Sequence, residues 1–187
     1  MTFFTDEFYW RIFDSECDFE ALRPEWDAVH EQYSAHLQTL TDLSPEVRLV
    51  GGPYRVDDCL LSVSRVNRRK STLMLCLRCG NTPDGYFDLI LHYTGVQFDD
   101  GLLGVLQDIA RRTIDSRRFA YDGWVHELDA GPGWVSHEIV FHYHPWPRGD
   151  DEGPKRLRIR CDSMKARTVP RKGRRLAPQC KRLRLET

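Results

Sequence analysis

The spacing of apolar residues divides the chain into a helical first quarter and a longer region of alternating pattern. Within residues 1–50, apolar side chains recur every three or four positions, which is the spacing of one helical face. The series is Trp26, Val29, Tyr33, Leu37 and Leu40. Thr5, followed by two acids, predicts the start of a first helix. Pro24 predicts the first turn of a second helix, because proline lacks the N–H that a first turn leaves unpaired. Ser44-Pro45 predicts the end of that helix.

From residue 54 onward, apolar and polar positions alternate, as they do in half-buried strands. Segments 57–66 and 71–79 flank the basic turn Asn67-Arg68-Arg69-Lys70 and predict a hairpin. Residues 85–96 predict a third strand. The leucines of the second strand share one face, and the aromatic and aliphatic residues of the third strand do the same. These positions are Leu73, Leu75, Leu77, Phe87, Leu89, Leu91 and Tyr93. Asp99-Asp100 then predicts the start of a short helix.

The second half of the chain predicts another hairpin and a basic strand. Segments 117–128 and 134–144 flank residues 129–133, which are rich in turn formers. A turn centred near Gly131 places His126 opposite about Ser136. His137 falls on the apolar face of its strand and is therefore expected to be a hydrogen-bonded core histidine. Residues 155–164 alternate as one further strand, with its arginines on the exposed face.

Together these segments predict an α+β fold, in which a helical N-terminal region packs on a mostly antiparallel sheet of about six strands with one short inserted helix. The parts are residues 1–50 (helical), 51–170 (β-rich) and 171–187 (a basic tail), within one domain overall. The composition, 41% hydrophobic and 29% charged, is ordinary for a globular protein. We expect a cytoplasmic protein without membrane contact, because no apolar run approaches a transmembrane length and the acidic N-terminus is unlike a signal peptide.

The net charge of the sequence changes sign abruptly near residue 154. Residues 1–154 hold 14 basic and 26 acidic side chains, a net charge of −12. Residues 155–187 hold 13 basic and 2 acidic side chains, a net charge of +11. An asymmetry of this size concerns partners rather than fold. Three interpretations stay open for the basic tail: it pairs with the acidic helices of its own chain, contacts a protein partner, or binds nucleic acid.

Candidate sites for metal or thiol chemistry are few. Cys76 and Cys79 form a CxxC, but no second pair exists, and residues three apart on a strand point to opposite faces. Six cysteines in a chain of this size are expected to be reduced core residues. His142 and His144 share one strand face and are the weak metal candidates. No cofactor is expected.

Parts of the chain resemble a small uncharacterised bacterial family. The resemblance rests on FFTDEFYWRIF and EQYSAHLQTL near the start, and on VDDCLLSVSRV and CLRCGNTPDGYFDLILHYTGVQF in the middle. It covers nearly the whole chain to about residue 170. The chain differs from the family pattern at VDDCLL, where a histidine before the aspartate is expected, and in its long basic end. The resemblance implies a bacterial, cytoplasmic α+β protein and no established activity.

No segment matches a catalytic signature, so we expect a non-enzymatic protein that binds a protein partner through an acidic surface, which suits a basic partner. An immunity or antitoxin-like protein is the concrete form of this hypothesis, since acidic surfaces steer basic nuclease toxins. The expected binding residues are Glu25, Asp27, Glu31, Asp150, Asp151 and Glu152. One alternative is a nucleic-acid-associated protein that uses the tail residues Arg171, Lys172, Arg174, Arg175, Lys181, Arg182 and Arg184. A second alternative is a metal-dependent hydrolase built around His142 and His144.

Overall fold

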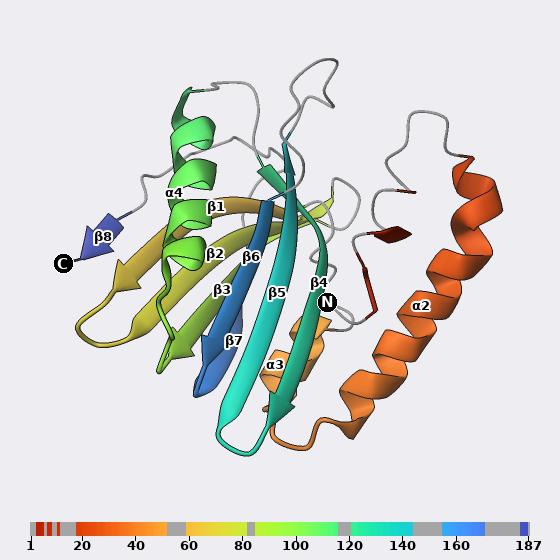
Figure 1. Cartoon of the computed structure of the whole chain (residues 1–187), viewed down its shortest axis with the longest axis horizontal. Helices are drawn as coiled ribbons and strands as arrows, with labels where there is room; N and C mark the ends of the chain where they lie inside the picture. The colour runs from red at the N-terminus through yellow and green to blue at the C-terminus, as the bar shows by residue number, and fades with distance from the viewer. Residues whose placement is uncertain are drawn as a thin grey trace.

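The computed structural model describes residues 3–5, 7, 8, 11, 18–51, 59–81, 85–115, 121–143, 155–170 and 184–186. Helices and strands follow one another along the chain as Figure 1 shows. They are α2 (Phe19–Thr39), α3 (Pro45–Gly51), β1 (Cys59–Asn67), β2 (Thr72–Asn81), β3 (Gly85–Thr94), α4 (Asp100–Asp115), β4 (Tyr121–Gly131), β5 (Trp134–Tyr143), β6 (Lys155–Cys161), β7 (Ser163–Pro170) and β8 (Arg184–Glu186).

The strands form one path, in the order β6-β5-β4-β1-β2-β3-β7. The path has a weak point between β4 and β1, where Cys59↔Gly123 and Leu60↔Asp122 are the only pairs among the described residues. It therefore consists of two antiparallel sheets, β6-β5-β4 and β1-β2-β3-β7, that separate beyond this junction. The short strand β8 pairs with the end of β1 in the parallel direction. The predicted α+β fold with a mostly antiparallel sheet is confirmed, with roughly the expected number of strands.

The core lies between the two sheets. The faces predicted for the second and third strands are the buried ones, since the leucines at 73, 75, 77, 89 and 91 are fully buried. From the other sheet, Ile139, Phe141, Leu157 and Ile159 are equally inaccessible. Alternation in both sheets thus buries a continuous apolar layer, which is the main source of stability in such a fold.

The prediction of one basic strand over residues 155–164 is wrong in one respect, because this segment belongs to two strands. β6 ends at Cys161, and β7 begins at Ser163 in the other sheet. Asp162 forms the corner, and its N–H donates to the carbonyl of Thr94 at 2.9 Å. The corner carries the chain from one sheet to the other, so β6 pairs with β5 while β7 pairs with β3.

The β4–β5 hairpin is tighter than the sequence predicts. Residues 129–131 remain in β4, and Pro132-Gly133 alone makes the turn, with Gly133 at φ 76. A left-handed backbone at the turn suits glycine and closes a two-residue connection. The expected pairing of His126 with Ser136 is therefore wrong, and His126 lies opposite Ile139.

The second predicted helix begins and ends elsewhere than expected. Asp18 caps α2 by accepting from the N–H groups of Glu20 and Ala21, so Pro24 lies inside the helix rather than in its first turn. Ser44-Pro45 does not end α2, which stops at Thr39; the Ser44 hydroxyl instead accepts from the Val47 N–H and starts α3. Asp99 caps α4 as predicted, through the Leu102 N–H at 2.6 Å. Figure 1 shows α2 beside β4, and α4 packs against β6.

Candidate functional site

A network of polar contacts between Tyr93, His137 and His126 crosses the buried core. The Tyr93 hydroxyl of β3 lies 2.8 Å from Nδ1 of His137 on β5. The other nitrogen of this ring, Nε2, lies 3.3 Å from Nδ1 of His126 on β4. His126 and His137 sit diagonally on adjacent strands, because His126 pairs with Ile139 and His137 with Leu128. This network thus links both sheets. The prediction that His137 is a hydrogen-bonded core residue is confirmed.

Burial keeps these histidines neutral. Loss of solvation lowers the pKa of His126 to about 4, with a smaller effect from nearby His30. Burial also holds the pKa of His137 well below its ordinary value, and His126 adds to this. A neutral imidazole donates at one nitrogen and accepts at the other, which matches the two contacts of His137. Burial likewise raises the pKa of Tyr93, so its hydroxyl stays protonated.

The network ends at His126, where α2 and the N-terminal segment contact β4. The Tyr33 hydroxyl on α2 accepts a hydrogen bond of 2.7 Å from the Leu128 N–H, and the Tyr33 ring contacts His126 edge-on. Glu127 accepts from the backbone N–H groups of Phe3 and Phe4 at 2.8 and 2.6 Å. Beyond its two described pairs with β1, the second edge of β4 needs other partners, and α2 supplies one at Leu128.

The opposite face of α2 is acidic. Tyr33 and Leu37 point into the core, and a helical repeat of 100° per residue places Glu20, Asp27 and Glu31 within about 40° of one another, outside the buried face. All three side chains are exposed. Glu25, which the sequence predicts on the same surface, lies on the opposite flank of α2 from Asp27 and is held by Arg11 in a two-point ion pair of 2.8 and 2.7 Å.

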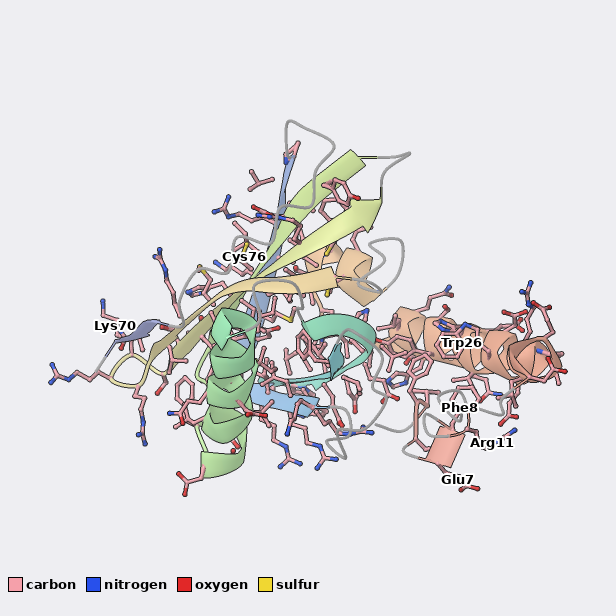
Figure 2. The ribbon with its side chains drawn as sticks, turned by 90° about the horizontal axis from the view of Figure 1, so that it is seen from above. Glu7, Phe8, Arg11, Trp26, Lys70 and Cys76 are labelled. Atoms are coloured by element: carbon pink, nitrogen blue, oxygen red, sulfur yellow. The ribbon has the colours of Figure 1, made fainter. Side chains whose placement is uncertain are left out.

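The acidic helix is at one end of the molecule and a basic turn is at the other. Figure 2 shows Arg11 and Trp26 at the right and Lys70 at the far left. The turn between β1 and β2 exposes Arg68, Arg69 and Lys70. An acidic helix and a basic turn therefore lie at opposite ends of the described structure, although both belong to the net acidic part of the sequence, residues 1–154.

The structure bears on the predicted basic tail at its last residues. Arg184 pairs with Arg65 of β1, Leu185 with Val66, and Glu186 with Asn67. Figure 1 shows β8 on the opposite side of the sheets from α2. This part of the tail therefore does not pair with the acidic helices, which contradicts that interpretation for residues 184–186. The other tail residues, Arg171, Lys172, Arg174, Arg175, Lys181 and Arg182, lie outside the described residues.

Other predicted site residues fall outside the described part of the chain. This holds for the acids Asp150, Asp151 and Glu152, and for His144; of His142 only the backbone, in β5, is described. Within the described residues, no three His, Cys, Asp or Glu side chains form a group that can hold a metal ion. Glu138, near His142 in sequence, accepts instead from Arg156 at 2.6 Å and Arg158 at 3.1 Å.

The CxxC pair is built into the sheet. Cys79 lies on the core face with Leu77, while Cys76 lies on the outer face opposite Ile90 of β3. Both thiols are buried, as are Cys59 and Cys161, and none of these four is in a disulfide. The two sulfurs therefore cannot bind one ion together. Beside Cys76 on the outer face, Arg78 and Asp88 form a buried ion pair of 3.3 Å.

Sequence reasoning missed Tyr93 and His126 as members of the core network. Tyr93 was assigned to an apolar face, and His126 was misplaced by the hairpin register. The available signal was a tyrosine and two histidines at inward positions of three strands, since buried polar side chains need partners.

No described helix is long and apolar enough to span a membrane.

Comparisons with protein-family models, with curated proteins and with solved structures find no match for this chain. The resemblance to a bacterial family therefore stays a prediction.

Proposed function

We propose that this chain is a bacterial, cytoplasmic binding protein that engages a basic protein partner through the exposed acidic face of α2. The observation that carries the proposal is the stripe of Glu20, Asp27 and Glu31 on the exposed surface of α2. With 21 residues, α2 is about 30 Å long, which is enough to span a standard interface.

The stripe is available to a partner. Among the described residues, Asp27 and Glu31 form no ion pair, whereas Glu20 pairs with Arg23 at 2.6 Å and Glu25 pairs with Arg11. Surface ion pairs of this kind contribute little stability, so these acids are not explained by folding. Their concentration on one helix suits electrostatic steering of a basic partner, which raises association rates.

The docking of α2 supports the same proposal. The Tyr33 hydroxyl, the Glu127 carboxylate and the buried Leu37 hold α2 and the segment before it on the sheet. A face held in place in the free protein costs less entropy on binding than one that must first become ordered. Neutralising a basic nuclease toxin, as an immunity protein does, is the concrete form of the proposed function.

The test uses full-length protein as bait in cells that express it. We compare the wild type, the variant Asp27→Lys/Glu31→Lys, and the control Asp100→Lys. The control removes an exposed acid on α4, away from α2. We expect the wild type and the control to capture one basic protein that the α2 variant loses. We also expect its association rate constant to fall as salt is raised.

Capture of the same partner by all three proteins would overturn the role of α2. Capture of an acidic partner, or an association rate constant that does not change with salt concentration, would overturn the proposed electrostatic attraction between α2 and its partner. If the partner is a nuclease, titration with the wild-type chain is expected to abolish its activity at equal concentration, and the α2 variant is expected to leave it active.

A further inference from the structure

A second charged surface lies on the outer face of β1-β2-β3-β7. The pairing register aligns Arg65, Met74, His92 and Lys165 in one row across the four strands. This row faces away from the core, because the neighbouring residues Val66, Leu73, Tyr93 and Met164 are the buried ones. Arg65, His92 and Lys165 are exposed.

Further basic side chains extend the row. Arg167 follows two positions after Lys165, on the same face of β7, and is exposed. At the end of the sheet, Arg68, Arg69 and Lys70 are exposed in the turn that Figure 2 shows projecting at Lys70. β8 then adds its backbone beside β1, with Arg184 opposite Arg65.

Acidic residues are few on this face in the described part of the chain. Asp88 shares the face, but it is buried and paired with Arg78. Asp99, Asp100 and Asp162 are exposed in the loop after β3, the first turn of α4 and the corner after β6, not on the face. Six exposed Lys and Arg side chains therefore gather on one face and its turn: Arg65, Arg68, Arg69, Lys70, Lys165 and Arg167. Among the described residues, the acidic positions on this face are the buried Asp88 and Glu186, which lies opposite Asn67 at the edge of the sheet.

We infer that this surface binds the phosphate backbone of duplex nucleic acid without reading its sequence. Neighbouring strands lie about 4.8 Å apart, so Arg65 and Lys165 are separated by about 14 Å, comparable to the roughly 12 Å width of the B-DNA major groove. Cations at this spacing reach phosphates of both strands. The row carries no Phe, Tyr or Trp, the residues on which single-stranded bases stack, so a duplex is favoured over a single strand.

The test measures binding of the full-length protein to a labelled 20-base-pair duplex by fluorescence anisotropy between 50 and 200 mM salt. We expect log K to fall linearly with log salt and to be the same for two unrelated sequences. Arg69→Ala and Lys165→Ala are each expected to reduce the steepness of that line by about 1, because each removes about one phosphate contact. Arg23→Ala, an equal change of charge on α2, is the control and leaves the line unchanged.

Three results would overturn the inference. The first is absence of salt-dependent duplex binding by the wild type. The second is equal behaviour of Arg69→Ala, Lys165→Ala and the control, which would place the contact elsewhere. The third is binding to vesicles of anionic phospholipid without binding to the duplex. The inference is independent of the proposed protein partner, because loss of that partner on changing α2 does not depend on duplex binding.

Discussion

The hydroxyl of Tyr93 and Nδ1 of His137 are 2.8 Å apart in the middle of the core, and the two residues belong to different sheets. The contact is fully buried on both sides. Removing one partner leaves the other unsatisfied in an apolar layer, which costs more than the hydrogen bond contributes. The pair therefore fixes which strands face each other, in addition to the apolar contacts around it.

Tyr93→Phe is expected to lower the free energy of unfolding by about 1–3 kcal/mol, because His137 loses its hydroxyl partner. The double variant Tyr93→Phe/His137→Leu is expected to lose less than the sum of the two single changes. Urea denaturation of all four proteins measures the coupling. Additive losses would show that the two side chains do not interact in solution.

The buried histidines predict a pH dependence with a definite sign. In the unfolded chain a histidine takes up a proton near pH 6.5, whereas in the fold burial lowers the pKa of His126 to about 4. Between these values the unfolded state binds more protons, so stability is complete above about pH 6.5 and falls as pH decreases toward 4. The loss from His126 is about 1.4 kcal/mol per pH unit. His137 shifts in the same direction.

Urea midpoints at pH 7.5, 6.0 and 5.0 test this dependence. His126→Gln is expected to flatten the fall in stability with pH, even if it lowers stability at pH 7.5. His92→Gln is the control, since His92 is exposed on β3, and it is expected to keep the wild-type slope. An unchanged slope in His126→Gln would contradict the assignment.

The apolar alternation of β2 and β3 was enough to predict their buried faces, because strand geometry fixes which residues share a side. It was not enough to predict that Tyr93 meets His137. The two residues are 44 positions apart, and spacing along one strand does not show which strand lies across the core. The corner at Asp162 was missed for a different reason. The alternation up to Cys161 is regular, and only the two exposed residues Asp162-Ser163 interrupt it.

The acidic surface shows the same division. The helical repeat predicts that Asp27 and Glu31 share the outer face of α2, and they do. The ion pair of Glu25 with Arg11 could not be predicted in the same way. Arg11 lies 14 positions before Glu25, and the helical repeat of α2 does not show which residue of the preceding segment contacts it. The acidic loop residues proposed with them lie outside the described part of the chain.

Tyr33→Phe tests the docking of α2 on the edge of β4. The variant removes the acceptor of the buried Leu128 N–H, so we expect a loss of about 1–3 kcal/mol of stability. The amide of Leu128 is also expected to exchange hydrogen faster. His36→Ala is the matched control on the same helix. It removes the partly exposed contact of His36 with Asp129 at 3.3 Å and the ring contact of His36 with Phe3, but no buried hydrogen bond, so it is expected to cost less than Tyr33→Phe.

Asp88→Asn is expected to destabilise the protein by about 1.5–3 kcal/mol, because the buried Arg78 guanidinium loses a charged hydrogen-bond partner. The double variant Arg78→Met/Asp88→Leu removes both charges and is expected to recover most of the loss. Thermal unfolding of the three proteins distinguishes the two effects. A mild Asp88→Asn variant would mean that Arg78 reaches solvent in the folded protein.

Gly95→Ala tests the corner that carries the chain between the sheets. Gly95 has φ 71, and a Cβ at this position would lie 1.9 Å from Oδ2 of Asp162. The substitution therefore adds backbone strain and pushes the corner residue away from Thr94, and we expect a loss of more than about 1 kcal/mol. Gly104→Ala is the matched control, because Gly104 is exposed within α4 and a Cβ there meets nothing within 4 Å. Alanine favours a helix over glycine by about 0.5–1 kcal/mol, so the control is expected to gain stability. Opposite signs for the same change of one methyl group would confirm the geometry of the corner. A stabilising Gly95→Ala would show that residues 95 and 162 are further apart in solution.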